Sequence, residues 1–171
     1  PPLQYSFSHF FGLSEGDCAT AIKIYREYYS EKGIFESGMY PGIRKCLRGL
    51  HEDGRKLVLA TSKPEIYARR ITEHFGISKY FSFEAGATMD STRNSKSDVI
   101  LYALRESGIT DLSSTAMVGD RDHDILGAKA AGIFPVGVLY GYGDREELEK
   151  AGAGAIVDTT DALLDWFRNR G

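Results

Sequence analysis

The sequence is poor in cysteine and in long apolar runs, and each scarcity argues against a class of protein. Cys18 and Cys46 are its only cysteines and lie far apart, without the spacing of metal ligands. We therefore expect two buried, reduced thiols in a cytoplasmic protein rather than a disulfide. No apolar run approaches the length of a membrane span, about 20 residues, and the first residues, PPLQYSFSHF, lack the basic and apolar regions of a signal peptide.

The sequence also lacks any cluster of basic residues. Its 21 Lys and Arg residues are spread along the whole chain, and the net charge is −3. A nucleic-acid-binding surface usually concentrates basic residues, so we expect no nucleic-acid partner and no membrane partner. The chain has 171 residues, of which 42% are hydrophobic. This length favours one globular domain with a real core, carrying at most a small accessory module.

The amino-terminal region has a helical pattern. Residues 15–33 place apolar side chains at helical spacing and end at Gly33, and the amphipathic stretch LQYSFSHFF precedes them. The segment SGMYPG (37–42) then interrupts the pattern with glycine and proline. We therefore predict a helical segment over residues 1–38 and a boundary before residue 39.

Apolar strands and helices alternate over the rest of the chain. The pattern predicts strands at 56–61, 80–86, 115–119, 134–139 and 155–158, and helices at 42–52, 64–75, 96–107, 123–131, 144–151 and from 160 onward. Strands that are each followed by a helix indicate an α/β fold, a parallel sheet with helices on both faces. In such folds the ligand crevice lies at the carboxyl ends of the strands.

Polar residues that can carry chemistry collect at these strand ends. Thr61 and Ser62 end the first strand of the alternating region, and Asp120 ends the third. Asp124 follows one helical turn later, on the side that faces back toward Asp120. Lys96 begins the helix before the third strand. We expect Thr61, Lys96, Asp120 and Asp124 to converge at one edge of the sheet.

The acidic stretch GDRDHD (119–124) admits more than one interpretation. A calcium loop of the EF-hand type is excluded, because Ile125 and Ala131 occupy the positions that require glycine and glutamate. Asp122 and Asp124 could simply cap and charge a helix. Capping does not explain Asp120 at the end of an apolar strand. Mg²⁺, held by one or two carboxylates and a substrate phosphate, explains it better.

Other candidates are weaker. The stretch GYGD (141–144) follows a strand as a dinucleotide-binding turn would, but Glu146 stands where the third glycine belongs, which favours a plain loop. His123 is close to the acidic stretch and is expected to be solvated. Arg93 could contact a substrate, although a solvated loop arginine is the simpler expectation.

Three features resemble motifs of the haloacid-dehalogenase-type phosphatases. The segment VLATSKP (58–64) resembles motif two, Lys96 resembles motif three, and GDRDHD (119–124) resembles motif four. The similarity is closest to the phosphoglycolate-phosphatase-like branch. It implies a Rossmann-like core over residues 39–171 and a partial helical cap over residues 1–38. It also implies Mg²⁺-dependent hydrolysis of a small phosphorylated metabolite, a phosphomonoester.

The resemblance assigns roles to individual residues. Thr61 would hydrogen-bond the phosphoryl group, the backbone of Ser62 would help to cradle it, and Lys96 would balance the charge of nucleophile and phosphate. Asp120 would bind Mg²⁺ directly. Asp124 would belong to the same metal site and orient the metal-bound water or Lys96.

One motif of the family is absent. D-x-D-G-T, which supplies the aspartate nucleophile and the general acid–base, does not occur, and the D-x-D triplets within residues 120–124 lack the trailing Gly-Thr. The resemblance implies a further segment of about 45 residues upstream, judged from ordinary element lengths. That segment would carry the central strand, between the strands that end at Thr61 and Asp120. Without it, we expect a poorly folded chain, or two half-sheets that close the gap and pair directly, which would distort the site.

Three other functions stay open from the sequence. A 5′-nucleotidase or a phosphomutase would use the same fold. A non-catalytic module that binds phosphate or a partner would need no nucleophile at all.

Overall fold

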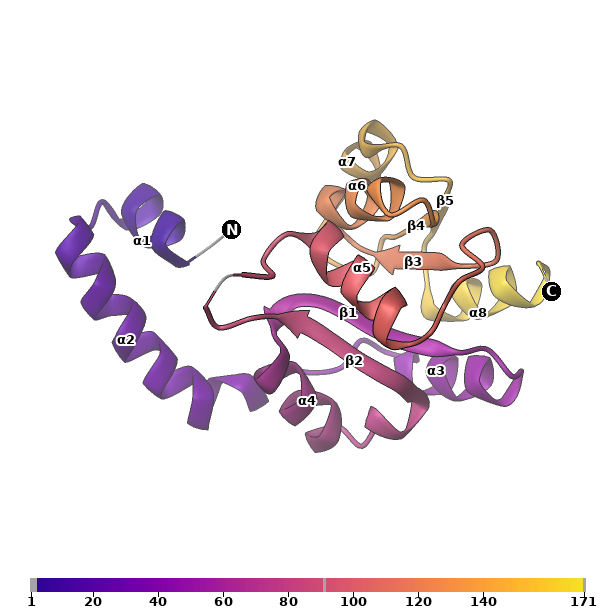
Figure 1. The fold of residues 1–171 in the computed structure, drawn as a ribbon, viewed down its shortest axis with the longest axis horizontal. Coiled ribbons are helices and arrows are strands. Elements are labelled where there is room, and N and C mark those ends of the chain that lie inside the picture. Colours follow the sequence, from indigo (N-terminus) through magenta and orange to yellow (C-terminus); the bar gives the residue numbers. More distant parts are fainter. Residues whose placement is uncertain (1–2, 91, 171) are drawn as a thin grey trace. The chain divides into compact units, whose positions relative to one another are not determined.

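The structure, a computed structural model, describes residues 3–90 and 92–170. The chain divides into two compact units, residues 1–38 and 39–171, and the division falls inside the SGMYPG segment. The elements of both units are labelled in Figure 1. That the first unit is part of a cap stays a prediction.

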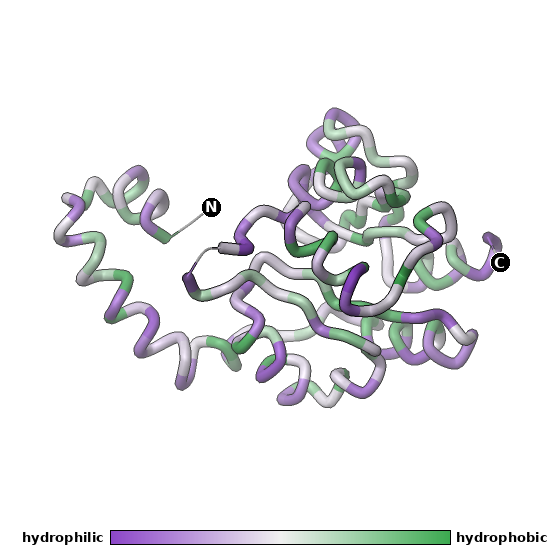
Figure 2. Tube along the Cα trace, viewed as in Figure 1, coloured by the Kyte–Doolittle hydropathy of each residue, from purple (hydrophilic) through white to green (hydrophobic). Residues whose placement is uncertain are grey.

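The first unit is helical, as its sequence pattern predicts. It contains α1 (Leu3–Phe11), α2 (Glu15–Glu31) and a 3-10 turn (Gly33–Phe35). Ser14 begins α2, because its hydroxyl accepts a hydrogen bond from the backbone N–H of Asp17. Hydrophilic and hydrophobic residues alternate along α2 in Figure 2, as expected for an amphipathic helix.

The second unit alternates strands and helices close to the predicted positions. Its strands are β1 (Leu57–Pro64), β2 (Phe81–Ala87), β3 (Ala116–Gly119), β4 (Phe134–Val138) and β5 (Ala155–Val157). Its helices are α3 (Ile43–Glu52), α4 (Glu65–His74), α5 (Lys96–Glu106), α6 (Asp122–Ala130), α7 (Arg145–Ala151) and α8 (Thr160–Arg168), with a 3-10 turn at Ser78–Tyr80. The α/β prediction is confirmed. β1 continues to Pro64, past the end predicted at Thr61.

The strands form two parallel sheets and not the single sheet predicted. β1 pairs with β2, and β3, β4 and β5 pair in that order. Within residues 3–90 and 92–170, no backbone ladder joins β1 to β3, so the two half-sheets have not closed on each other. The missing pairing between β1 and β3 therefore falls where the family resemblance puts the central strand.

Apolar side chains nevertheless hold the two sheets together on both faces. On one face, Leu57 of β1 and Val118 of β3 pack against a buried cluster from α3, β4, β5 and α8. On the other face, Ala60 of β1 and Met117 of β3 pack against a cluster from α5, α6 and the segment between α6 and β4. Burial of apolar surface, which needs no directed bonds, spans a distance that the backbone ladders do not.

Helices α3 and α8 are joined although they lie far apart in sequence. The Arg168 Nε atom lies 2.7 Å from Asp53 Oδ2, and the Thr160 hydroxyl donates to the carbonyl of Pro41 at 2.9 Å. A Cβ atom at Gly49 would stand 3.0 Å from Leu164, so the helices approach closely there. The beginning and the end of the second unit are thus packed against each other.

Both cysteines are free and buried, as expected from the sequence. Burial raises the pKa of the Cys46 thiol to about 11, so the thiol stays protonated at neutral pH. Over the described ranges, 3–90 and 92–170, no helix combines the length and the apolar character needed to cross a membrane.

We predict that residues 1–171 unfold with low cooperativity. Each of the facing edges of β1 and β3 lacks a strand partner in the part of the chain that the structure describes. An unsatisfied buried backbone group costs about 1–3 kcal/mol, and a strand edge carries several. Differential scanning calorimetry would give a van't Hoff enthalpy well below the calorimetric enthalpy. One sharp transition with equal enthalpies would contradict this prediction.

Candidate active site

Thr61 lies where β1 loosens from its neighbour. The pairing with β2 is regular from Val58 to Thr61, which lies opposite Gly86, and then shifts before Pro64. The Thr61 hydroxyl accepts a hydrogen bond from the backbone N–H of Lys63 at 3.2 Å, while Ser62 and Lys63 are exposed. This turn presents a hydroxyl and exposed backbone at the carboxyl end of the strand, as the strand-end prediction requires.

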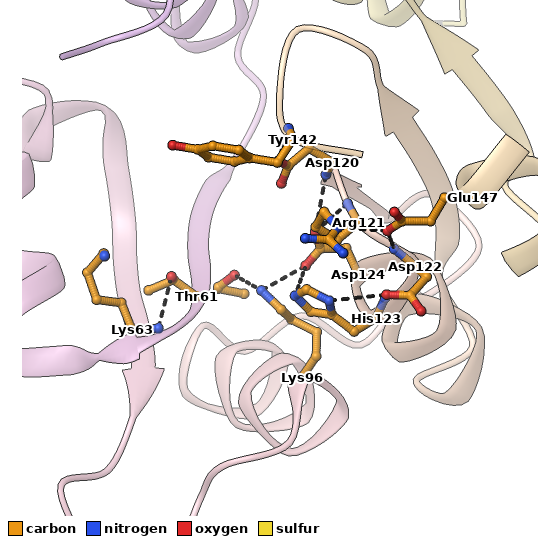
Figure 3. Close-up of polar contacts among 11 residues, drawn as sticks. Thr61, Lys63, Lys96, Asp120, Arg121, Asp122, His123, Asp124, Tyr142 and Glu147 are labelled. Atoms are coloured by element: carbon orange, nitrogen blue, oxygen red, sulfur yellow. Dashed lines mark hydrogen bonds and ion pairs between the residues drawn. The ribbon is translucent and has the colours of Figure 1, made fainter. Parts of the chain in front are cut away.

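Lys96 is the first residue of α5, and its side chain points into the unit. Ser95 caps the helix by accepting from the N–H of Asp98. The Lys96 side chain is only 9% exposed, and its Nζ atom lies 2.8 Å from Asp124 Oδ1 and 3.4 Å from the carbonyl oxygen of Ala60. Figure 3 shows the ammonium group between β1 and the Asp124 carboxylate. One cation therefore contacts β1 of the first sheet and α6, the helix that follows β3 of the second sheet.

Asp124 is buried beneath the end of β3. Its second oxygen, Oδ2, accepts the backbone N–H groups of Asp120 at 3.1 Å and of Arg121 at 3.2 Å. A Cβ atom at Gly119 would stand 2.2 Å from Asp124 Cβ, so only glycine permits this approach. The carboxylate caps the first turn of α6 and pairs with Lys96 at the same time.

Asp120 is fixed by the loop after β4. Its Oδ2 atom accepts the backbone N–H of Tyr142 at 2.8 Å. A Cβ atom at Gly141 would stand 2.2 Å from the Asp120 Cβ atom, and one at Gly143 would stand 2.0 Å from the Asp120 carbonyl oxygen. The GYGD stretch is thus a loop that holds the carboxylate at the strand end. Burial, followed by the Asp120 charge, raises the pKa of the neighbouring Tyr40.

The other residues of the acidic stretch serve the start of α6. Asp122 is half exposed and accepts the backbone N–H of His123, as a helix-start carboxylate does. His123 is also half exposed, as predicted for a solvated residue, and its Nε2 atom lies 3.8 Å from Asp124 Oδ1. Arg121 pairs with Glu147 at 2.7 Å, which raises the pKa of its guanidinium.

Arg93 corrects an expectation. It was expected to be a solvated loop arginine, but its side chain is 19% exposed and pairs with Glu65 at 2.8 Å. The guanidinium also covers the ring of Tyr102 at 3.5 Å from the centroid. Sequence spacing gave no sign of this pair, because Glu65 and Arg93 belong to different elements 28 positions apart.

Magnesium fits part of this arrangement. Within residues 3–90 and 92–170, no group of three or more His, Cys, Asp or Glu side chains is placed to hold a metal alone. Mg²⁺ needs only one or two carboxylates, because waters and substrate phosphate complete its shell. Asp120 offers such a carboxylate at the strand end. Both oxygens of Asp124 are already engaged by Lys96 and backbone N–H groups, which suits an orienting role.

We predict that Gly143→Ala destabilises the chain by about 1–3 kcal/mol, the cost of overpacking. The added methyl group would collide with the Asp120 carbonyl, and backbone cannot move aside as a flexible side chain can. Gly38→Ala is the matched control, because it is also a loop glycine without a positive φ and nothing lies within 4 Å of its Cβ position. Urea titration of both variants, made in the protein that includes the upstream segment, measures the difference. Equal free energies of unfolding would show that the loop tolerates the methyl group.

Relatives that are named for different activities match this chain. A 5′-nucleotidase of Pseudomonas aeruginosa is 36% identical over 86% of this chain and 66% of its own length. The tyrosine-protein kinase PtkA of Mycobacterium tuberculosis is 40% identical over 98% of this chain and 56% of its own length. A phosphoglycolate phosphatase of Vibrio parahaemolyticus is 33% identical over 95% and 71%. The chain spans less than two thirds of the length of the first two.

Solved structures are also similar to this chain. The crystal structure of a predicted phosphatase from Clostridium acetobutylicum superposes with a TM-score of 0.88 at 38% identity, covering 99% of this chain and 78% of that one. Residues 1–138 match the sequence family described as haloacid dehalogenase-like hydrolases. This match extends from the amino-terminal helices through Lys96 and Asp120 to the end of β4, and the chain therefore belongs to the haloacid dehalogenase-like hydrolase family.

Proposed function

We propose that this chain forms the phosphate-binding and metal-binding part of a Mg²⁺-dependent phosphatase that hydrolyses a small phosphomonoester. The observation that carries the proposal is the position of the Lys96 ammonium, which lies 2.8 Å from Asp124 and 3.4 Å from the Ala60 carbonyl. Ala60 directly precedes Thr61 in sequence, and Asp124 follows Asp120 by four positions. A buried cation at the carboxyl ends of the parallel strands can stabilise the negative charge of a dianionic phosphate group.

Each residue has a part in holding the phosphoryl group. Thr61 donates a hydrogen bond from its hydroxyl to a phosphoryl oxygen, and the backbone N–H of Ser62 donates another. Lys96 offsets the negative charge that nucleophile and phosphate bring together. Phosphoryl transfer depends mainly on positioning and charge cancellation, so these groups account for much of the catalysis expected of the site.

Asp120 would hold Mg²⁺, with Asp124 behind it orienting Lys96 and a metal-bound water. When bound, the metal ion supplies positive charge that the phosphoryl oxygens require during transfer. Asp120 itself stays oriented because the Tyr142 N–H fixes one of its oxygens. The other carboxylate oxygen is the one that we assign to the metal.

The nucleophile belongs to a segment upstream of residue 1, on a strand between β1 and β3. Its aspartate oxygen would attack phosphorus, the bond from phosphorus to the leaving oxygen would break, and the leaving group would take a proton from a second carboxylic acid. Water would then give a proton to that second carboxylate and attack phosphorus, the bond from phosphorus to the aspartate oxygen would break, and inorganic phosphate would be released. The unpaired edges of β1 and β3 support this assignment, because both neighbours of a central parallel strand already run in the required direction.

The relatives support two substrate classes. The match to a 5′-nucleotidase favours a nucleoside monophosphate as the substrate of this protein, and the match to a phosphoglycolate phosphatase favours a small phosphorylated acid. Parallel assays of both substrates on the protein that includes the upstream segment would choose between them. Transfer of phosphate to tyrosine, suggested by the kinase PtkA, would appear as phosphotyrosine formation in place of phosphate release.

We predict that Asp120→Asn strongly lowers turnover and weakens activation by Mg²⁺ in the protein that includes the upstream segment. A neutral amide is a poorer ligand for this hard cation than a carboxylate. Asp122→Asn is the matched control, because Asp122 is half exposed and engages the start of α6. Hydrolysis of p-nitrophenyl phosphate over a range of Mg²⁺ concentrations measures both. Equal effects would remove Asp120 from the metal site.

Residues 1–171 alone are predicted to show no Mg²⁺-dependent phosphomonoesterase activity above background. The reason is that the proposed aspartate nucleophile is not among them. Phosphate release from p-nitrophenyl phosphate, with and without a chelator, is the measurement. Robust metal-dependent turnover by this purified chain would refute the upstream nucleophile and would make a residue of the chain, such as Asp122, the candidate.

A further inference from the structure

The pair Arg93–Glu65 lies between the two phosphate-binding elements proposed above, and the function assigned so far does not use it. Glu65 begins α4, immediately after the turn that carries Thr61 and Ser62. Arg93 lies in the loop that leads into α5, three positions before Lys96. Their side chains are 22% and 19% exposed, and Arg93 contacts Glu65 Oε2 at 2.8 Å.

The end of β2 lies between the two residues and is bonded to both. The Gly86 carbonyl accepts from Arg93 Nε at 2.8 Å, and the Gly86 N–H donates to Glu65 Oε2 at 3.4 Å. A Cβ atom at Gly86 would stand 2.6 Å from the Lys63 carbonyl and the Glu65 backbone. The end of β2 is thus packed closely against residues 63–65. The Arg93 guanidinium bonds the carbonyl of Gly86, and the Glu65 carboxylate bonds its N–H.

Arg93 also reaches the helix that carries Lys96. Its guanidinium covers the Tyr102 ring on α5. The Thr88 N–H donates to the Arg93 carbonyl, and the Arg93 N–H donates to the Thr88 hydroxyl. A planar guanidinium can bond a carboxylate and a carbonyl at its edge while it stacks on an aromatic face. One side chain therefore connects the start of α4, the end of β2 and α5.

We propose that Arg93 and Glu65 are a positioning pair, which sets the place of the Thr61–Ser62 turn relative to the Lys96 ammonium. The proposal rests on the proposed function, since it concerns the phosphate that these two elements bind together. Neither residue touches the phosphate. A shift of about 1 Å between groups that grip one phosphoryl unit is enough to lower the rate by two orders of magnitude.

Arg93→Gln in the protein that includes the upstream segment tests this. We expect kcat/KM for p-nitrophenyl phosphate to fall by about tenfold or more, and the inhibition constant of inorganic phosphate to rise by a similar factor. The Mg²⁺ concentration for half-activation should stay unchanged, because Asp120 is held by the separate loop at Tyr142. A general loss of structure would change all three values together.

Arg69→Gln is the matched control. Arg69 is the other partner of Glu65, at 2.9 Å from Oε1, but its side chain is 48% exposed and lies on α4 itself. We expect kcat/KM within about twofold of the unchanged protein, as for an exposed ion pair. Arg93→Lys should restore only part of the loss, because an ammonium cannot bond two acceptors and stack as a guanidinium does. Thermal melts of each variant verify folding.

A double variant completes the test. If the pair acts as a unit, Glu65→Gln with Arg93→Gln should lose no more than the worse single variant. The positioning role is overturned if Arg93→Gln and Arg93→Lys keep normal phosphate inhibition, or if Arg69→Gln loses as much. Should the unchanged protein neither hydrolyse phosphomonoesters nor bind inorganic phosphate, the proposed function fails first, and the positioning role fails with it.

Discussion

A buried ion pair between Lys96 and Asp124 is the interaction on which the rest of the site depends. The two side chains are 9% and 6% exposed, so both charges have lost most of their water. Such a pair is tolerated only when further hydrogen bonds satisfy it, and here the Ala60 carbonyl and two backbone N–H groups do so. Because these partners belong to β1 and the end of β3, the pair also links the two sheets electrostatically.

The sequence predicted the elements well because their signals are local. Strands such as KLVLAT and helices with apolar residues at helical spacing can be identified in short windows. The continuation of β1 to Pro64 was missed, because a polar TSKP stretch gives no strand signal and is extended only through its contact with β2. The split into two sheets is a tertiary property, since it depends on which strands find a neighbour.

The candidate site divides in the same way. Thr61, Lys96, Asp120 and Asp124 could be predicted as site candidates because parallel strands bring their carboxyl ends to one edge, a rule that needs only element order. Arg93 was misjudged because its partner lies in another element. The two glycines of the GYGD loop are visible in the sequence, but their spacing alone did not predict that they pack against Asp120. Their absent side chains make room for Asp120.

The packing of α3 against α8 sets the order in which this unit can become stable during synthesis. Residues near 41–55 leave the ribosome more than a hundred positions before their partners at 160–168. Until then, Cys46 and Leu50 of α3 lack the apolar face of α8 and remain open to other chains. Each strand–helix pair in between can form as it emerges, whereas the face built on α3 is completed only by the last helix. A nascent chain that stalls before residue 160 would therefore be a natural client for a chaperone.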